Sequence, residues 1–229
     1  MPASEVGKNP EKMRLSAEIG AYAHGRVPRA LRHRQVVAAA VDLFIERGYE
    51  RAAMDELARR VGVSKPVIYD LVGSKEQLFR EVMTAEAAEL AQRTVTAVSS
   101  EPDPERRLHA GALAFFRYVE ERRAYWGSLI VSDAAPVTRE MAAARRQQAA
   151  LAARLLAEGA AETGSRVDSR LMDVCAHAIN AALEAMALWW QDHPDLTPEQ
   201  LADLATRLLQ PGLMTLRDAR LSGAITAAG

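Results

Sequence analysis

Apolar residues recur at helical spacing along most of the chain. Val37, Val41 and Phe44 share one face of a predicted helix that begins near Arg29, and Gly48 suits the backbone just past its end. Comparable stripes follow down the chain, and no segment shows the sustained alternation of apolar and polar residues that marks a strand. The pattern predicts an all-α protein of about nine helices.

Start signals divide this helical pattern into elements. Ser74 and Gln77 form a capping box before a helix predicted over 75–98, and Thr197 and Gln200 form another before the last helix. Further helices are expected to open at Asp103–Pro104 and at Pro136, and a long one is expected over 169–192.

A short helix, a glycine and a second short helix follow one another near residue 62. Gly62 provides the turn, Ser64 is placed to cap the second helix, and Pro66 falls in its first turn, where its missing N–H has no partner to lose. Ile68 faces inward, which leaves Lys65, Val67, Tyr69 and Asp70 more exposed. This arrangement predicts a helix-turn-helix, whose second helix enters the major groove of DNA.

Individual residues of this segment suit contacts with DNA. Lys75 opens the following helix, where free backbone N–H groups favour a phosphate, and Tyr69 is also placed for a phosphate contact. Val67 either packs locally or touches a thymine methyl group, and Lys65 contacts the DNA backbone or a base. The predicted DNA-binding residues are Ser64, Lys65, Pro66, Val67, Tyr69, Asp70 and Lys75.

The same segment resembles the tetracycline-repressor (TetR) family of bacterial regulators. The resemblance covers about residues 30–80 and rests on Leu43-Phe44, Gly48-Tyr49, Gly62-Val63-Ser64, Ile68-Tyr69, and Ser74-Lys75-Glu76 with Leu78. It implies an N-terminal three-helix DNA-binding domain followed by a helical domain for ligand binding and dimerisation. It further implies a homodimer that binds a double-stranded DNA operator, represses transcription and leaves the DNA when a small effector binds.

Several residues depart from the family's pattern. Ala52 and Ala53 stand where a Thr or Ser usually caps the second helix, and losing such a cap typically costs ~1 kcal/mol. Pro66 replaces a common glycine, and Leu71 cannot donate a hydrogen bond to a phosphate. Asp70 would be repelled by phosphate, although it could accept a hydrogen bond from a cytosine amino group. These departures leave room for a helical sensor or adaptor that keeps the motif only as scaffold.

Charge and composition divide the chain further. Residues 1–28 mix Gly, Pro and both charge signs without periodicity, which indicates a flexible arm before a DNA-binding domain over 29–80 and a helical domain over 81–229. Residues 1–80 hold 14 lysines and arginines against 10 acidic residues, whereas the remainder holds 15 against 20. The positive end is therefore the one that would bind a polyanion.

The second half of the chain contains a group of aromatic residues. Aromatics at helical spacing form either a core or the wall of a ligand cavity, which would also need a few polar groups. Asn180 lies in the apolar run CAHAINAALEAMALWW, so its amide bonds locally, reaches a ligand or pairs across a dimer axis. The predicted ligand-binding residues are His109, Phe115, Phe116, Tyr125, Trp126, His177 and Asn180.

The last two predicted helices indicate an oligomer. The helix over 169–192 is apolar nearly all round, so it must be covered on more than one side. Two such helices from each of two subunits would form a four-helix bundle, and the alternative is a core helix of a monomer. The predicted interface residues are Leu171, Ile179, Met186, Leu201, Leu204 and Leu208.

Other classes of protein find little support in the sequence. Apolar residues make up 49% and charged residues 26%, as in soluble globular proteins, and we expect no membrane span and no signal peptide. A single cysteine, Cys175, fits a reducing compartment and so the cytoplasm. Cys175 and His177 point to different faces of a helix, and no catalytic motif occurs, so we expect no metal, no cofactor and no enzyme activity. The sequence predicts a ligand-responsive DNA-binding regulator, a repressor released by a small, largely apolar molecule.

Overall fold

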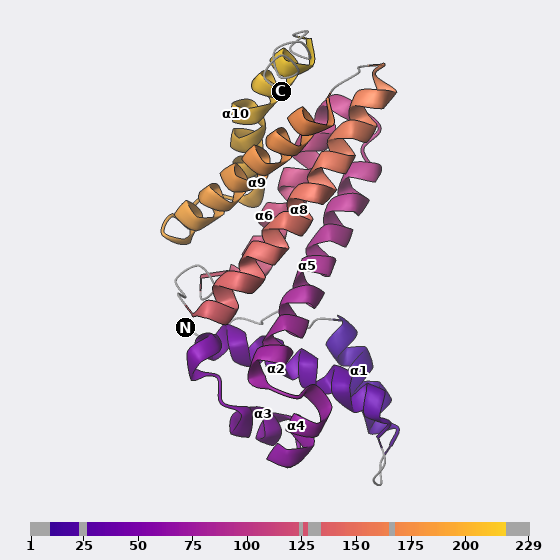
Figure 1. The fold of residues 1–229 in the computed structure, drawn as a ribbon, viewed down its shortest axis with the longest axis vertical. Coiled ribbons are helices and arrows are strands. Elements are labelled where there is room, and N and C mark those ends of the chain that lie inside the picture. The colour runs from indigo at the N-terminus through magenta and orange to yellow at the C-terminus, as the bar shows by residue number, and fades with distance from the viewer. Residues whose placement is uncertain (1–9, 23–26, 124–125, 128–133, 165–167, 219–229) are drawn as a thin grey trace. The chain divides into compact units, whose positions relative to one another are not determined.

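The fold is helical throughout the part of the chain that the structure describes. The computed structural model describes residues 10–22, 27–123, 126–127, 134–164 and 168–218 (Figure 1). These residues contain nine α-helices, one short 3-10 helix and no strand, which confirms the predicted all-α class. The helices group into two compact units, unit 1 with Met1–Ala85 and Ala124–Glu140, and unit 2 with Glu86–Arg123 and Met141–Gly229.

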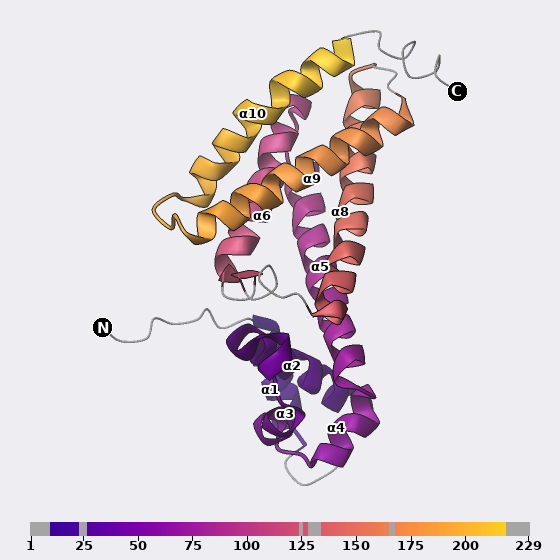
Figure 2. The same ribbon diagram turned by 60° about the vertical axis from the view of Figure 1, so that its left-hand side comes forward.

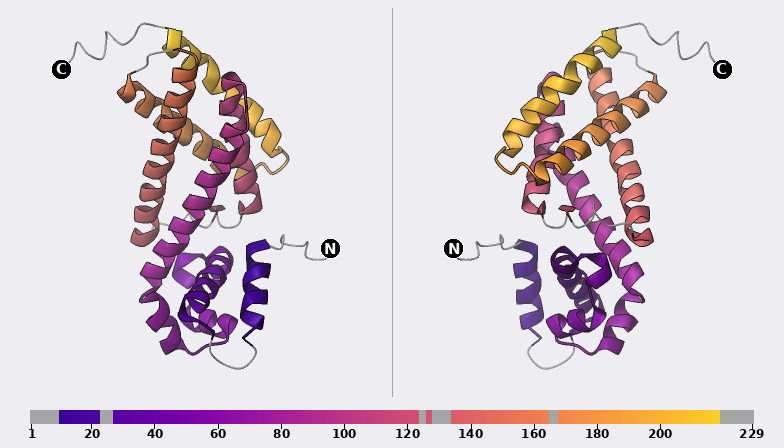
Figure 3. Two further views of the ribbon diagram at one scale, coloured as in Figure 1. Left: turned by 90° about the vertical axis from the view of Figure 1, so that its right-hand side faces the viewer. Right: turned by 90° about the vertical axis from the view of Figure 1, so that its left-hand side faces the viewer.

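Unit 1 is built from the first helices of the chain. They are α1 (Pro10–Gly20), α2 (Arg29–Arg51), α3 (Met54–Val61), α4 (Lys65–Val72) and the beginning of α5 (Lys75–Ser99). The helix α1, which lies beside α2 (Figure 3), falls inside the range that the sequence analysis expected to be an arm. Its Leu15 is only 5% exposed, and one such apolar contact is too little to stand out as a periodic pattern.

The core of unit 1 contains side chains from α2, α3, α4 and α5. Phe44 of α2 and Phe79 of α5 meet edge to face with ring centroids 5.2 Å apart, and Tyr49 meets Phe79 at 4.9 Å. Leu57 of α3 and Ile68 of α4 are completely buried. Phe44 and Ile68 were predicted to face inward, whereas Val36, Ala40 and Leu43 of α2 are buried and the predicted Val37 and Val41 are only partly so.

Two glycines of unit 1 have the positive φ that their turns require. Gly48 interrupts α2 with φ 69°, and Gly62 ends α3 in the left-handed region with φ 74° and ψ 36°. The capping box of α5 is present, since Ser74 N donates to Gln77 Oε1 (2.9 Å) and Gln77 N donates to Ser74 Oγ (3.1 Å). The predicted cap of α4 is wrong in part, because Ser64 occupies the cap position but its side chain makes no capping hydrogen bond.

Unit 2 contains the rest of the chain's helices. They are the remainder of α5, η1 (Pro104–Arg106), α6 (Arg107–Glu121), most of α8 (Ala135–Glu162), α9 (Ser169–Gln191) and α10 (Pro198–Asp218). The helix α10 packs mainly along α6, and it follows α9 after a short turn, so that α9 and α10 lie side by side (Figure 2). Asp103 and the Thr197–Gln200 capping box hold their helix starts as predicted.

Trp190 lies at the centre of unit 2. Both Trp190 and Phe116 are completely buried, and their rings meet edge to face at 6.2 Å. The Trp190 indole Nε1 donates to the Leu196 carbonyl at 2.9 Å, and the Arg123 guanidinium lies over its ring at 4.4 Å. This tryptophan therefore ties α6, α9 and the turn before α10 together.

By length and composition alone, α9 could cross a membrane, whereas the sequence analysis expected no membrane span. Its mean hydropathy reaches 1.3 over a window of which 22% is buried. Polar residues nevertheless follow one stripe along the helix, namely Asp173, His177, Asn180 and Glu184. Glu184 pairs with Arg145 of α8 at 2.8 Å, and a charge at the centre of a bilayer would cost about 2.5–3.5 kcal/mol. A stripe of polar and charged residues of this kind is unusual for a helix that spans a membrane.

Candidate nucleic-acid interface

The helix α4 is anchored on one side and open on the other. Ile68 and Val72 are buried against unit 1, at 0% and 4% exposed. Val67 and Tyr69 are each 40% exposed, a large value for such apolar side chains. The face of α4 opposite its anchor consists of Pro66, Val67, Tyr69 and Asp70. The structure thus brings together the exposed residues that the sequence analysis assigned to the second helix of the motif.

The first residue of α4 pairs with α3. Lys65 Nζ lies 2.9 Å from Asp55 Oδ1, and the hydrogen bond from this carboxylate raises the pKa of Lys65. Both side chains are more than half exposed. Such an exposed pair is weak and exchanges readily with other partners, so Lys65 remains able to reach a phosphate or a base.

The start of α5 holds Lys75 in a specific position. Lys75 Nζ donates to the Glu50 carbonyl at 3.0 Å and lies 4.8 Å from the centroid of the Tyr49 ring. Burial lowers the pKa of this lysine. The predicted phosphate contact therefore requires the ammonium group to share or leave the Glu50 carbonyl, and that contact stays a prediction.

An ion-pair cluster fixes α3 against α2. Arg60 donates to Glu46 with two bonds of 3.0 and 2.6 Å and to Glu56 with one of 2.6 Å. The hydrogen bond from Arg60 lowers the pKa of Glu46. This cluster adds surface ion pairs to the buried contacts that hold α3, the helix before α4.

The aromatic residues predicted to line a ligand cavity fall in different places. Phe115 and Phe116 of α6 are buried core residues of unit 2, with ring centroids 5.3 Å apart. Trp126 is 8% exposed and belongs to the segment that groups with unit 1. Tyr125 lies outside the described residues. Trp190, which the sequence analysis placed only in the apolar stripe of α9, is the aromatic residue that Phe116 contacts.

The polar residues predicted for the same cavity also separate. His109 Nε2 lies 2.9 Å from Asp203 Oδ1, so it joins α6 to α10. His177 is exposed, and its Nδ1 lies 2.8 Å from the Asp173 carbonyl of its own helix. Asn180 differs from both, because its Nδ2 is buried with no hydrogen-bond partner among the residues described. A buried donor of this kind costs about 1–3 kcal/mol unless something accepts its hydrogen bond.

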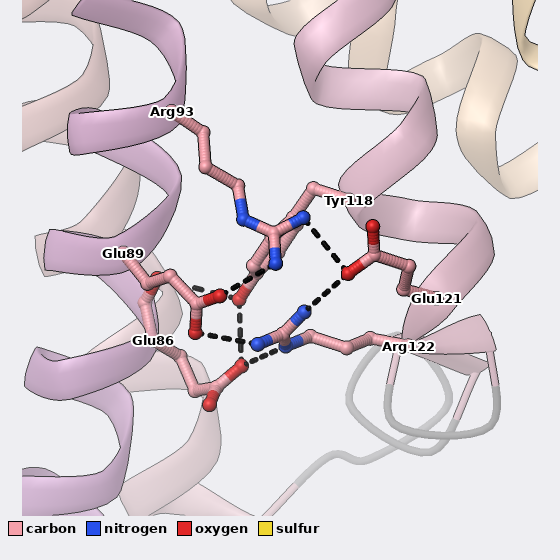
Figure 4. Close-up of polar contacts among 6 residues, drawn as sticks. All are labelled: Glu86, Glu89, Arg93, Tyr118, Glu121 and Arg122. Atoms are coloured by element: carbon pink, nitrogen blue, oxygen red, sulfur yellow. Dashed lines mark hydrogen bonds and ion pairs between the residues drawn. The ribbon is translucent and has the colours of Figure 1, made fainter. Parts of the chain in front are cut away.

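An ionic network that the sequence analysis missed lies between α5 and α6 in unit 2 (Figure 4). Glu86 is 8% exposed, and its Oε2 accepts from Tyr118 Oη at 2.7 Å and from Arg122 Nε at 2.6 Å. Arg122 also donates to Glu89, and Arg93 bridges Glu89 and Glu121 at 2.7 and 2.8 Å. Burial is the largest single influence on the pKa of Arg122 and would lower it, but the combined effect of Glu86, Tyr118 and Glu89 is greater and raises that pKa.

The outer faces of α9 and α10 form an apolar surface. Leu204 is 49% exposed and Leu208 68%, while Leu171 and Met186 are half-buried, and their place in an interface stays a prediction. Ile179 and Leu201 are instead covered within the unit, at 6% and 1% exposed. A groove of about 300 Å³ opens on this surface and is lined by Ala185, Met186, Trp189, Leu196, Leu201 and Leu204. Exposed residues that the sequence analysis did not assign to it are Val174, Leu188 and Trp189.

Within the described ranges, no cluster of three or more His, Cys, Asp or Glu side chains could hold a metal ion. Cys175 is buried on α9, and this burial raises the pKa of its thiol. A thiol with a raised pKa is a weak nucleophile at neutral pH, so the residue acts as a small core side chain.

Family models match both halves of the chain. The model described as bacterial regulatory proteins, tetR family, matches residues 36–82, which include α3 and α4. A second model, described as tetracyclin repressor-like C-terminal domain, matches residues 104–211. The chain belongs to the TetR family. In this TetR-family protein, α4 is the second helix of the predicted helix-turn-helix, the helix that is expected to contact DNA.

Individual TetR-family relatives extend this comparison. The HTH-type transcriptional activator FasR of Mycolicibacterium smegmatis is 40% identical over 95 residues, which cover 42% of this chain and 43% of FasR. A TetR-like regulator from Rhodococcus sp. RHA1 is 27% identical with a TM-score of 0.61, over 82% of this chain and 99% of that one. FadR from Bacillus subtilis, solved with stearoyl-CoA, shares the fold at 16% identity with a TM-score of 0.61, over 81% and 97% of the two chains.

Proposed function

We propose that this TetR-family protein is a transcription regulator that binds duplex DNA as a homodimer and responds to a small effector. The observation that supports DNA binding best is the open face of α4. Two buried residues fix that helix, while Val67 and Tyr69 stay exposed on a surface of unit 1. A fixed helix with an open face of mixed apolar and polar side chains is the arrangement by which a helix-turn-helix presents its second helix to the major groove.

The proposed dimer interface is the apolar surface of α9 and α10. Two recognition helices must lie about 34–36 Å apart, or a multiple of that, to reach successive major grooves, so one subunit alone cannot read a two-part operator. Val174, Leu188 and Trp189 of α9, with Leu204 and Leu208 of α10, supply an apolar surface that a second copy would cover. Covering it would also account for an α9 that is apolar on both its inner and outer faces.

The proposed effector is a largely apolar molecule that carries a hydrogen-bond acceptor. Unit 2 is rich in buried aromatic side chains, and the Asn180 amide has an unused donor. FadR of Bacillus subtilis, which shares this fold, was solved with stearoyl-CoA. Stearoyl-CoA is therefore the first probe to test, with coenzyme A alone as the control that lacks the apolar chain. An effector acts only through its different affinity for the DNA-bound and free conformations.

Binding to duplex DNA tests the proposal. We expect the wild type to bind duplex DNA and Val67→Glu to lose most of this binding, because the new carboxylate would face the phosphates. Tyr22→Glu is the matched control, since Tyr22 is 45% exposed in the same unit but lies outside α4. A helical sensor or adaptor that keeps the motif only as scaffold would show no duplex binding by filter retention at low salt. Repression, rather than activation, stays a prediction that a reporter gene downstream of the bound site would test.

A further inference from the structure

Asp70 is the one carboxylate on α4, and it lies on the outer face of that helix. Because Ile68 and Val72 face the core, residues 66 and 70, one turn apart, point away from it. The Asp70 side chain is 69% exposed. A bare negative charge in this position would oppose the approach of any polyanion.

Arg29, the first residue of α2, holds this carboxylate. Its Nη1 donates to Asp70 Oδ2 and its Nη2 donates to the Asp70 backbone carbonyl. The planar guanidinium thus contacts a side chain and the main chain of α4 at once, which offsets the charge of Asp70 and favours one rotamer of its side chain. The Arg29 side chain is 64% exposed, and exposed ion pairs add little to stability. The pair therefore affects the charge that α4 presents to a partner more than it affects the stability of the fold.

The second carboxylate oxygen is available. Asp70 Oδ1 has no hydrogen-bond partner among the residues that the structure describes. In the major groove, a carboxylate accepts a hydrogen bond from the N4 amino group of cytosine. Adenine also offers an amino group, but its neighbouring N7 is an acceptor that repels a carboxylate, so cytosine is the better partner.

We propose that Asp70 is a specificity-determining residue that reads one cytosine in each operator half-site, and that Arg29 is the positioning residue that makes this contact possible. The inference rests on the proposed function, because it requires α4 to enter the major groove. It assigns a role to a residue at which this chain departs from the pattern of its family. Pro66 and Val67 on this face are apolar, which leaves Asp70 and the Tyr69 hydroxyl as its hydrogen-bonding groups.

Selection of bound sequences from random duplex DNA tests the proposal. The wild type is expected to favour C·G at one position of each half-site by roughly tenfold over the other pairs. Asp70→Asn should lose this preference and shift towards adenine, because an amide can bond both N6 and N7 of that base. Glu81→Gln removes one carboxylate from α5 of the same unit and is the matched control, with unchanged preferences expected.

Arg29 is tested through the same readout. Arg29→Ala leaves the charge of Asp70 uncompensated, so we expect about tenfold weaker binding to every duplex and a weaker preference for cytosine. In the double variant Arg29→Ala with Asp70→Asn, the charge is gone and most of the general affinity should return. A purely structural role for Arg29 would give equal losses with and without Asp70.

The outcomes distinguish a failure of the role given to Asp70 from a failure of the proposed function. If the wild type and Asp70→Asn select the same sequences, Asp70 does not read a base and this inference is overturned while the proposed function stands. If the wild type binds no duplex at all, the proposed function fails and this inference fails with it. Melting temperatures of the variants, expected to match the wild type, exclude unfolding as the cause of any loss.

Discussion

The two units place their charges and apolar side chains in opposite ways. In unit 1, the ion pairs around α4 are exposed, and the large apolar residues exposed on that helix are Val67 and Tyr69. In unit 2, Glu86 is buried in an ionic network, whereas large apolar residues such as Trp189 and Leu208 are 50% and 68% exposed. The first arrangement suits a charged, hydrated partner like DNA, and the second suits an apolar partner like a second subunit.

The partner that an exposed apolar side chain indicates therefore depends on the residues around that side chain. An exposed valine among ion pairs on α4 is part of a mixed surface that can meet both phosphates and base edges. Leu204, an exposed leucine of α10, lines an apolar groove together with residues such as Met186 and Trp189 of α9, and apolar surface of this kind remains in water only at a cost. The same degree of exposure therefore indicates different partners in the two units.

Leu208→Arg should have the largest effect on this contrast. A charge inside a self-complementary apolar contact meets its own copy and finds no partner, which costs roughly 3–5 kcal/mol, or about a hundredfold to several thousandfold in dimer affinity. We expect monomers in sedimentation experiments, loss of operator binding and unchanged helix content. Ala157→Arg on the exposed polar face of α8 is the control and should remain dimeric. A stable Leu208→Arg dimer would place the interface elsewhere.

Arg122→Ala should have the next largest effect, this time on stability. It leaves Glu86 buried without its cationic partner, so we expect a loss of roughly 3 kcal/mol in the free energy of unfolding. Tyr118→Phe removes one hydrogen bond to the same carboxylate and should cost about 1 kcal/mol. Arg29→Ala, in the exposed pair of unit 1, should change stability by less than about 0.5 kcal/mol. Equal losses from Arg122→Ala and Arg29→Ala in urea titrations would refute the contrast between buried and exposed charges.

Lys75→Ala should have a moderate effect that is confined to DNA binding. If Lys75 meets a phosphate, its loss weakens binding to all duplexes alike and reduces the slope of log affinity against log salt by about one. Lys75→Arg keeps the charge and should restore that slope. An unchanged salt slope for Lys75→Ala would mean that the lysine serves only the Glu50 carbonyl and the Tyr49 ring.

The smallest expected effect is a pH dependence of unit 1. Arg60 lowers the pKa of Glu46 in the folded chain, so this pair stabilises the fold above the unfolded pKa of Glu46 and the contribution is lost as the pH falls through its folded pKa. Because Glu46 is half exposed, the loss should be only about 0.5 kcal/mol. Melting curves between pH 6 and pH 3 should therefore show a small acid-induced decrease that is reduced in Arg60→Ala. An identical decrease in the variant would assign it to other carboxylates.

The helix boundaries of unit 1 around α4 could be predicted because the residues that set them act locally. Gly62, Pro66 and the Ser74–Gln77 capping box each act within a few residues of their position, so the helix boundaries around α4 could be predicted closely. The pairing of Arg29 with Asp70 could not, because the two residues are 41 positions apart and either could have remained solvated. The helix α1 was missed because it carries too few apolar positions to show a period.

The ligand-binding assignments in unit 2 depend on tertiary contacts that periodicity does not reveal. In the sequence, Phe116 and Asn180 both lie in apolar stretches. In the structure, Phe116 contacts Trp190 in the core, whereas the Asn180 amide has a donor without a partner. His109 was expected near a ligand and instead pairs with Asp203, 94 positions away. The acidic residues Glu86 and Glu89 with Arg93 do follow helical spacing on α5, a signal that could have indicated the network in Figure 4.

The most direct test of the account is the symmetry of the DNA that the protein selects. Both surfaces must act together, with α4 reading each half-site and the α9–α10 surface fixing the distance between two copies. Selection from random duplex DNA should enrich an inverted repeat whose half-sites are one helical turn, about 10–10.5 base pairs, or a multiple of that apart, and Leu208→Arg should abolish the enrichment. Enrichment of an unpaired site, or of the same repeat by Leu208→Arg, would contradict the account.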